Sequence, residues 1–337
     1  MTFRLSTLLF AGIGLALASA GVAPAAEPVT VDNFKRAETH YYMQDRASAG
    51  CFAKLCHERA PKAVNEQNVV RLNRDTIYSS GVFDLTTPLT ITLPDPKGRF
   101  QSLLVINEDH YNPLVTYGPT TVTLTQESAG SRYVFLAFRT FIDPNDPKDM
   151  DAAHRLQDAI KVEQASPGKL DLPDWDAKQR EELRNGLRAI FKFQPAAEGR
   201  FGKESQVDPV HHLIATAGGW GGNPLEAAMY ITRTPDQNDG VIPYTLTMKD
   251  VPVDGFWSVI VYNAEGFYEA PETSISANSV TAKKNSDGSA TIHFGGDPSA
   301  PNYLRIMAGW NYTVRLYRPR QDAITGKWTV PDAIAVK

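Results

Sequence analysis

The chain has 337 residues, of which 42% are hydrophobic and 21% charged, and its formal net charge at pH 7 is −4. This length allows two domains of ordinary size, each with its own hydrophobic core. The small net charge and the lack of a basic block in the sequence argue against nucleic acid as a partner, because phosphate binding requires clustered Lys and Arg.

The first 25 residues have the pattern of a secretory signal peptide. Arg4 supplies a positive charge, an apolar run follows from Leu8 to Ala18, and small residues lie at positions 23–25. The apolar run is short for a bilayer span, and no later segment reaches the required length. We therefore expect a periplasmic or secreted protein with no membrane span after signal cleavage.

Residues 27–62 are expected to form an N-terminal helical arm. Asp32 and Asn33 can cap a helix that carries Phe34, Ala37 and Tyr41 along one face. Such a helix would serve to pack against the rest of the protein.

Cys51 and Cys56 are the two cysteines of the chain. On a continuous α-helix, residues five apart have Cα atoms more than about 8 Å apart, which exceeds the disulfide range. A helix through both cysteines and a bond between them therefore exclude each other. A disulfide and a pair of buried free thiols remain alternatives, and His57 alone does not complete a zinc site.

Residues 63–145 are expected to form the first of two jelly-roll-like antiparallel β-sandwich domains. Runs rich in Val, Ile, Thr and aromatic residues are separated by turn residues. These runs cover residues 69–85, 89–94, 99–109, 120–126 and 132–141. No helical pattern separates them, which favours antiparallel pairing.

Residues 146–222 are expected to form a helical section and a Gly-rich loop between the two β-domains. Helical patterns cover residues 150–164 and 175–193. A third helix is indicated by Asp208 as N-cap and Pro209 as first helical residue. The loop after it, residues 217–224, contains Trp220 as its only bulky side chain.

Residues 223–337 are expected to form the second jelly-roll-like domain. The strand candidates are residues 227–235, 244–250, 256–265, 279–285, 290–296, 311–319 and 327–330. The sequence Asn-Ser-Asp-Gly at positions 285–288 predicts a hairpin turn. Together with the earlier elements, this predicts a mainly β fold with some α-helix.

An internal repeat supports two related β-domains. Each copy follows a turn with Pro and Gly, at residues 94–98 and 251–255. Four positions are identical: Phe100, Ser102, Val105 and Asn107 recur as Phe256, Ser258, Val261 and Asn263. We therefore expect Phe100 and Phe256 to occupy equivalent positions in the two domains.

Several motifs resemble a known bacterial family. They are LNRDTIYSSGVFDL, PDPKGRF, QVDPVHHLIATAGGWGGNP, FWSVIVYNAEGFY, TAKKNSDGSATIHFGG and MAGWNYTVRLYRP. They resemble bacterial exported proteins that pair domain of unknown function 1254 with domain of unknown function 1214, over about residues 65–319. The resemblance implies a double jelly roll with helices between the domains, and assembly as a homo-oligomer such as a trimer. Members are sometimes labelled hydrolases or carboxylesterases, but the resemblance implies no reaction or catalytic residue.

A cluster of titratable side chains ends the first copy of the repeat. Glu108, Asp109 and His110 stand where the second copy has residues 264–266. Since imidazole titrates near neutral pH, His110 is the candidate general base, with Asp109 or Glu108 to orient it. The alternative is a histidine that is hydrogen-bonded at a strand end without catalytic function.

Arg139 interrupts an apolar strand. A guanidinium in this setting either pairs with a carboxylate such as Asp75 or holds an anionic ligand, and Arg315 poses the same question. The candidate pocket residues are Asn73, Asp75, Tyr78, Trp220 and Asn223. Tight turns and domain packing explain the same residues without a ligand.

Other candidates have weaker patterns. The sequence has no G-x-S-x-G motif, so Ser79 and Ser80 are expected to be strand residues and not nucleophiles. His211 and His212 are adjacent on a predicted helix, about 100° apart, and cannot easily share an ion. His293 has no obvious partner, and we expect no metal site and no cofactor.

The sequence leaves two kinds of function open. One is a hydrolase-like enzyme for a small or carbohydrate-like substrate, in which His110 is the base and Arg139 holds an anionic group. The other is a non-catalytic binding or homo-oligomeric assembly module, in which the same polar residues stabilise loops. A closed polar pocket around His110 favours the enzyme.

Overall fold

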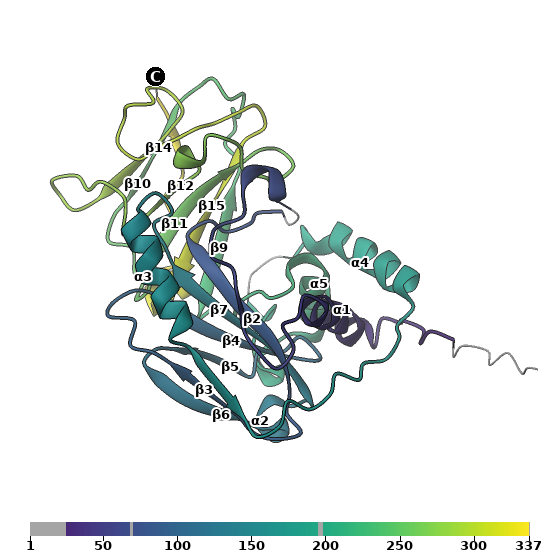
Figure 1. Ribbon diagram of the computed structural model, residues 1–337. Helices are drawn as coiled ribbons and strands as arrows, with labels where there is room; N and C mark the ends of the chain where they lie inside the picture. Colours follow the sequence, from purple (N-terminus) through teal and green to yellow (C-terminus); the bar gives the residue numbers. More distant parts are fainter. Residues whose placement is uncertain (1–24, 68–69, 195–197, 337) are drawn as a thin grey trace, which may run out of the picture.

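A computed structural model describes residues 25–67, 70–194 and 198–336 of the protein. The predicted signal peptide lies outside these residues except for its last position. Two β-rich domains make up most of the described chain, and helices α1, α4 and α5 gather on one side of the first domain (Figure 1). Among the described residues, no helix combines the length and the apolar character that a membrane span requires.

The first domain is a sandwich of two antiparallel sheets. The larger sheet has the order β1 (Cys56–His57), β2 (Thr76–Asp84), β7 (Tyr133–Phe141), β4 (Gln101–Asn107) and β5 (Leu114–Tyr117). The smaller sheet has the order β6 (Thr120–Leu124), β3 (Leu89–Leu93) and β8 (Lys161–Gln164). Alternate strand residues face the space between the sheets and form a buried apolar core. This core includes Phe83, Leu89, Ile91, Leu103, Val105, Leu136 and Phe138.

The second domain is also a sandwich. One sheet has the order β12 (Ser276–Asn278), β11 (Trp257–Tyr262), β15 (Asn311–Tyr317) and β9 (Ala228–Arg233). The other has the order β14 (Tyr303–Leu304), β13 (Ala290–Phe294), β10 (Tyr244–Met248) and β16 (Ile334–Ala335), with β14 parallel to β13. Trp310, Tyr312 and Phe294 lie at the centre of its core. The structure therefore confirms the predicted fold class, mainly β with β-sandwich domains.

The two domains share one topology. The sheet order β9-β15-β11-β12 repeats the order β2-β7-β4-β5, and β13-β10-β16 repeats β6-β3-β8. The register also repeats, because Ser102 lies opposite Arg139 and Ser258 lies opposite Arg315. The internal repeat of the sequence therefore corresponds to equivalent strands, β4 and β11.

The repeated phenylalanines contact each other across the domain boundary. The rings of Phe100 and Phe256 lie 5.2 Å apart in an edge-to-face arrangement. Both belong to one aromatic cluster with Phe141 and Tyr317, and the backbone oxygen of each accepts a hydrogen bond from the end of the neighbouring strand. The two positions are equivalent in topology, and they join the domains instead of filling two separate cores.

Helices occur before, within and between the β-domains in sequence. The longer ones are α1 (Phe34–Ser48), α3 (Pro147–Asp158), α4 (Ala177–Phe191) and α5 (Pro209–Gly219), and the short ones are α2 (Gln126–Ala129) and α6 (Gln321–Ile324). Single 3-10 turns occur at η1 (Val64–Glu66), η2 (Glu204–Gln206) and η3 (Glu272–Ser274). Asp208 caps α5 as predicted, because its Oδ1 accepts hydrogen bonds from the backbone N–H groups of Val210 and His211.

Three predicted segments differ in the structure. Residues 161–164 form strand β8 instead of extending a helix, because Ile160 and Val162 pack into the first core. Residues 279–285 form a turn and not a strand, since Asn278 Oδ1 accepts hydrogen bonds from the backbone of Val280 and Thr281. Residues 327–330 are also irregular.

The buried face of α1 is more polar than its apolar spacing predicts. Tyr41 is exposed, whereas Glu38 is buried between two arginines of α4. Glu38 Oε2 accepts a hydrogen bond from Arg180 at 2.6 Å, and Oε1 accepts one from Arg184 at 2.7 Å. This charged contact fixes α1 against α4.

Replacement of Glu38 by Ala should reduce the free energy of unfolding by about 3–5 kcal/mol, because it leaves two nearly buried guanidinium groups without an anion. Glu181→Ala is the matched control, since Glu181 pairs with the same arginines but is 47% exposed. The control should cost less than about 1 kcal/mol. Urea denaturation measures both values, and equal losses would contradict a special role for Glu38.

The structure decides between the two states of the cysteines. Cys51 and Cys56 form a disulfide, with Cα atoms 5.6 Å apart. The bond is geometrically accessible because α1 ends at Ser48, before the first cysteine. It closes a short loop that leads from α1 into strand β1.

The double variant Cys51→Ser/Cys56→Ser should unfold at lower urea concentration, with a loss of about 2 kcal/mol for a loop this short. The loss follows from the greater freedom of the unfolded chain. Thiol labelling of the denatured wild-type protein should find no free cysteine. Two labelled cysteines in protein prepared without reductant would contradict the bond.

Candidate functional site

His110 lies in a tight turn after strand β4. Asn107 Oδ1 accepts hydrogen bonds from the backbone N–H groups of Asp109 and Tyr111, which closes the turn. His110 has a φ of 66°, and the equivalent position of the second domain is Gly266, with a φ of 91°. The left-handed backbone is uncommon for residues other than Gly, so a tightly bonded turn is required to hold it.

Both ring nitrogens of His110 are hydrogen-bonded inside the protein. The backbone N–H of Gly221 donates to Nε2 at 2.8 Å. Thr216 donates its hydroxyl proton to the carbonyl oxygen of His212, so its oxygen is free to accept from His110 Nδ1 at 2.9 Å. The ring is fully buried and is stacked between Trp220 and His212. This is the geometry of the second of the two sequence interpretations, a histidine whose ring is hydrogen-bonded within the protein.

Asp109 and Glu108 do not orient His110. Asp109 forms a two-pronged ion pair with Arg36 of α1. Glu108 Oε1 contacts His40 at 2.9 Å, and its Oε2 accepts hydrogen bonds from the backbone N–H groups of Arg132 and Tyr133. The three side chains of the predicted catalytic cluster thus point to different partners, because consecutive residues of a tight turn diverge.

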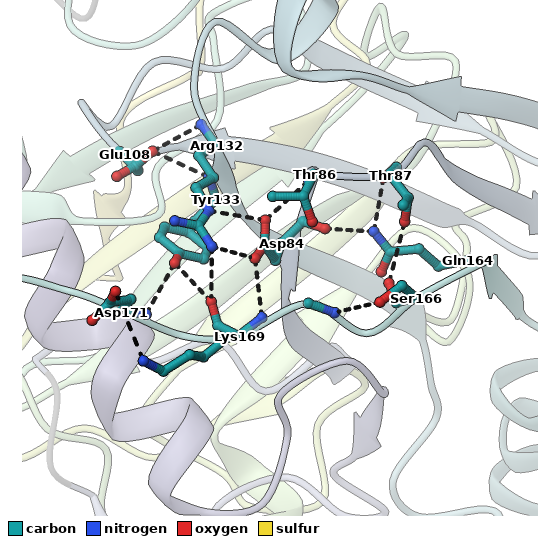
Figure 2. A network of polar contacts seen from close by, with 11 residues as sticks. Asp84, Thr86, Thr87, Glu108, Arg132, Tyr133, Gln164, Ser166, Lys169 and Asp171 are labelled. Atoms are coloured by element: carbon teal, nitrogen blue, oxygen red, sulfur yellow. Dashed lines mark hydrogen bonds and ion pairs between the residues drawn. The ribbon is translucent and has the colours of Figure 1, made fainter.

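Figure 2 shows Glu108 at the margin of a larger structural network. Its centre is the buried Asp84, which accepts hydrogen bonds from Arg132 at 2.8 and 3.1 Å and from the backbone N–H of Lys169 at 3.1 Å. Burial alone would raise the pKa of Asp84, but these hydrogen bonds hold the pKa below its ordinary value. The network attaches the segment after β8 to the first domain.

The histidines of α5 and the candidate serines have structural surroundings as well. His212 is buried, with Nδ1 2.8 Å from the carbonyl oxygen of Arg200, whereas His211 is partly exposed. Ser79 is buried and hydrogen-bonds to His57 Nδ1 at 2.7 Å and to Gln157. Within residues 25–67, 70–194 and 198–336, no group of three or more His, Cys, Asp or Glu residues could hold a metal ion.

The buried histidines should make the protein less stable in mild acid. Burial holds the pKa of His110 well below its usual value, with the positive charges of His212 and Lys35 acting in the same direction, and burial also lowers the pKa of His212. Below about pH 6.5 the unfolded chain binds protons that the folded protein does not, so the free energy of unfolding should fall from about pH 7 to about pH 5.

Urea denaturation at several pH values measures this dependence. His110→Asn should show a smaller slope than the wild type, because Asn tolerates the left-handed turn but does not titrate. An identical slope in wild type and variant would contradict a neutral buried His110.

Two equivalent rows of polar side chains lie on the outer faces of the β2-β7-β4-β5 sheet and the β9-β15-β11-β12 sheet. In the first domain the strand partners place Tyr78 beside Arg139, Arg139 beside Ser102, and Ser102 beside Tyr117. In the second domain the corresponding row is Tyr230, Arg315, Ser258 and Asn278. Each row therefore has a buried arginine at the same strand position, and both rows lie at the boundary between the domains.

Arg139 has neutral partners. It donates hydrogen bonds to Asn223 Oδ1 at 3.2 Å and to the carbonyl oxygen of Gly221 at 2.9 Å. Its guanidinium also lies 5.6 Å from the centre of the Tyr78 ring. The side chain is fully within the protein, with 8% of the residue surface exposed, and no ion pair of Arg139 occurs among the described residues. The predicted ion pair of Arg139 with Asp75 is therefore wrong.

Asp75 instead contacts the second domain. Its Oδ1 accepts hydrogen bonds from Ser276 at 3.2 Å and from Asn278 at 3.0 Å. Burial raises the pKa of Asp75, although these hydrogen bonds and the charge of Arg315 oppose the shift. Asp75 is therefore hydrogen-bonded to two residues of strand β12, in the second domain.

The other predicted ligand-binding residues lie in two places. Asn73 donates to the Tyr317 hydroxyl at 3.1 Å, and Asn223 donates to the Tyr230 hydroxyl at 2.8 Å, so both join Tyr78 and Arg139 at the domain boundary. Trp220 lies elsewhere. Its ring is stacked on the Tyr42 ring, with ring centres 4.2 Å apart, and its Nε1–H donates a hydrogen bond to the Thr39 hydroxyl of α1. The structure brings together Asn73, Asp75, Tyr78, Arg139 and Asn223 but not Trp220.

Tyr117 connects the first row to a cleft of about 300 Å³. Asn112, Lys203, Gln206 and Glu226 supply polar groups to the same cleft. Burial raises the pKa of the Tyr117 hydroxyl to about 12, while the charges of Arg318 and Arg139 oppose the shift and Glu226 adds to it. Asn112, Tyr117 and Tyr230 were not predicted as site residues. Strand register brings Tyr117 and Tyr230 to the boundary, and Asn112 lies in the connection between β4 and β5. Aligning residues 228–233 with strand β2 would have revealed Tyr230.

Family models match both β-rich parts of the chain. The model of the protein of unknown function DUF1254 matches residues 52–127, and that of DUF1214 matches residues 227–321. A search of curated proteins found no match.

Two crystal structures resemble the whole fold. One is the VPA0106 protein from Vibrio parahaemolyticus, with 16% identity, a TM-score of 0.70, and coverage of 91% of this chain and 98% of that chain. The other is a putative uncharacterized protein from Burkholderia cenocepacia, with 14% identity, a TM-score of 0.54, and coverage of 91% and 88%. At these identities the likeness extends to the fold alone. The chain thus belongs to the proteins that pair an N-terminal DUF1254 domain with a C-terminal DUF1214 domain.

Proposed function

We propose that the protein binds a small hydroxylated carboxylic acid, such as a sugar acid, at the boundary between its two β-domains. Arg139 would hold the carboxylate. The observation that carries the proposal is the burial of this guanidinium without an ion pair among the described residues. A buried charge is costly unless a counter-charge or strong hydrogen bonds compensate it, and an anionic ligand would supply both.

The guanidinium has hydrogen-bonding capacity to spare. Arg139 has five N–H donors, and its two hydrogen bonds go to Asn223 and Gly221. Since both partners are neutral, the full positive charge acts on whatever binds beside it. Tyr78 and Tyr230 provide hydroxyl groups nearby, as the influence of both on the pKa of Arg139 indicates.

The adjacent cleft suits hydroxyl groups. Asn112 is only 2% exposed, yet neither its amide nitrogen nor its amide oxygen has a hydrogen-bond partner among the residues that the structure describes. Buried amides are normally satisfied, so an unpartnered donor and acceptor at the wall of a cleft suggest a site for a polar ligand. The volume of about 300 Å³ lies at the lower end of the range for small-molecule sites.

Catalysis by a His and carboxylate pair is less well supported than binding. A general base needs a free ring nitrogen that faces the substrate, whereas both nitrogens of His110 are engaged within the protein. Hydrolase activity would therefore have to use other groups, and we do not assign any.

Export of the protein, which the pattern of residues 1–25 predicts, is part of this proposal. The Cys51–Cys56 disulfide is compatible with an oxidising compartment. A binding protein of the periplasm or exterior would meet sugar acids as free small molecules.

Isothermal titration calorimetry with galacturonate should detect binding, and galactose, which lacks the carboxylate, should bind at least tenfold more weakly. Arg139→Gln should weaken galacturonate binding roughly 10- to 100-fold, because a hydrogen bond to a charged group contributes about 1.5–3 kcal/mol. Arg188→Gln is the matched control, since Arg188 is exposed on α4.

A second variant separates binding from folding. Asn112→Leu removes a buried amide that has no partner, so the melting temperature should stay the same or rise while galacturonate binding weakens. Unchanged affinity in both Arg139→Gln and Asn112→Leu would refute the proposed site.

A further inference from the structure

We propose a second ligand site, in a cleft of about 950 Å³ lined by the aromatic cluster of Phe100, Phe141 and Phe256, which takes an organic anion with an aromatic body and a hydrogen-bond donor. This site shares Tyr117 with the smaller cleft but is otherwise built from different residues. The proposal does not depend on Arg139.

The duplicated turns form the walls of this cleft. Residues 94–101 of the first domain line one side, and residues 254–256 of the second domain line another. Helix α3 contributes Asp149, Ala152, Arg155 and Leu156, and Ala159 follows directly after it. Each turn leads into the repeated strand of its own domain, β4 or β11. The cleft therefore forms where the turn before β4 of the first domain meets the turn before β11 of the second domain.

Aromatic side chains line the cleft at the domain boundary. Phe100, Phe141 and Phe256 pack edge to face, with ring centres 4.8 and 5.2 Å apart, and Tyr117 lies 5.9 Å from Phe100. Phe100 remains partly exposed, whereas Phe256 is buried. An aromatic ligand can stack on or abut the exposed part of this cluster, and such contacts contribute beyond the area that they bury.

Among the described residues, the charges that line the cleft without an ion pair are three positive, Lys97, Arg155 and Arg318, and one negative, Asp95. Its acidic groups include Asp149, which pairs with Arg99, and Asp254, which pairs with Arg320. Asp95 accepts a hydrogen bond from the backbone N–H of Lys97. In contrast, none of the side chains of Lys97, Arg155 and Arg318 takes part in an ion pair with another described residue. A cleft with unpaired cations attracts anions, even on a protein of net charge −4.

Arg318 is held in place at the boundary of this cleft. Its guanidinium lies over the Tyr117 ring, 4.6 Å from the ring centre. Its backbone is in the left-handed region, with a φ of 51°, and its N–H donates to the carbonyl oxygen of Ala227. This backbone conformation and this hydrogen bond therefore hold Arg318 beside the aromatic cluster, where its guanidinium can contact the anionic end of a ligand.

A buried amide oxygen supplies the third recognition element. Gln101 is 1% exposed, and its amide nitrogen donates a hydrogen bond to Thr140 at 3.1 Å, whereas its Oε1 has no partner within residues 25–67, 70–194 and 198–336. Gln101 is one of the lining residues of the cleft. A carbonyl oxygen that is buried and unpartnered should accept a hydrogen bond from a ligand hydroxyl or N–H group.

Together these groups select a class of ligand. Unpaired cations favour a carboxylate, the phenylalanines favour an aromatic ring, and Gln101 favours a hydroxyl or N–H donor on that ring. A volume near 950 Å³ accommodates such a molecule within the range of known small-molecule sites. Hydroxyaryl carboxylates combine all three features.

The test is calorimetric titration of the full mature protein with 4-hydroxyphenylacetate. Two analogues each lack one feature: phenylacetate has no hydroxyl donor, and 4-hydroxybenzyl alcohol has no carboxylate. Each should bind at least fivefold more weakly than 4-hydroxyphenylacetate. Failure of 4-hydroxyphenylacetate to bind at millimolar concentration, or equal binding of the three compounds, would overturn the proposal.

Variants then locate the site. Lys97→Glu/Arg155→Glu reverses two exposed charges of the cleft and should weaken binding at least tenfold without lowering the melting temperature. Gln101→Met should weaken binding of 4-hydroxyphenylacetate but not of phenylacetate. Arg188→Glu, outside the cleft, should leave the affinity unchanged. Wild-type affinity in the double charge variant would refute this location, whatever the result with galacturonate.

Discussion

The arrangement of the two domains depends on two buried arginines, Arg139 and Arg315. They lie between the β2-β7-β4-β5 sheet of the first domain and the β9-β15-β11-β12 sheet of the second. Arg139 and Arg315 occupy the same position in equivalent strands, and each is flanked by Tyr and Ser in the neighbouring strands. A guanidinium cannot be buried against an apolar surface without a large cost, so the boundary between the domains has to be polar. Asn73, Asp75 and Asn223 meet that requirement with side-chain oxygens and nitrogens. The domains are consequently joined by a hydrogen-bonded network with an aromatic cluster at one end.

Duplication explains why the boundary has this form, and divergence explains where it is asymmetric. Asp75 and Ala227 occupy equivalent positions, because their carbonyl oxygens accept hydrogen bonds from equivalent residues at the ends of β7 and β15. The first domain has a carboxylate there, and the second does not. His110 and Gly266 differ in the same way within one kind of turn. The side chain of His110 contacts helix α5, and that of Asp75 contacts the second domain. Both therefore add packing contacts outside the strands of their own domain.

The sequence predicted most of the strands, but it did not predict which side chains contact one another. Alternating apolar residues and turns predicted most strands, and the repeat of Phe100 and Asn107 predicted the common topology. Strand β8 was missed because its pattern continues that of α3, and only the open edge of β3 selects the extended form. The site residues that could be found were those whose chemistry conflicts with an apolar strand, such as Arg139. Tyr117, Tyr230 and Asn112 have ordinary patterns. Strand pairing places the two tyrosines at the boundary, and the connection between β4 and β5 places Asn112.

Glu108, Asp109 and His110 differ from Arg139 in where their side chains find partners. Three adjacent polar residues in a turn must diverge, so Glu108, Asp109 and His110 each meet a different element and each finds a partner. An isolated arginine inside a strand has no such neighbours, and its partners must come from elsewhere in the fold. For Arg139 they are neutral, which leaves its charge available. In a duplicated fold, a polar residue that recurs at equivalent strand positions is therefore a stronger indication of a site than a polar cluster in one turn.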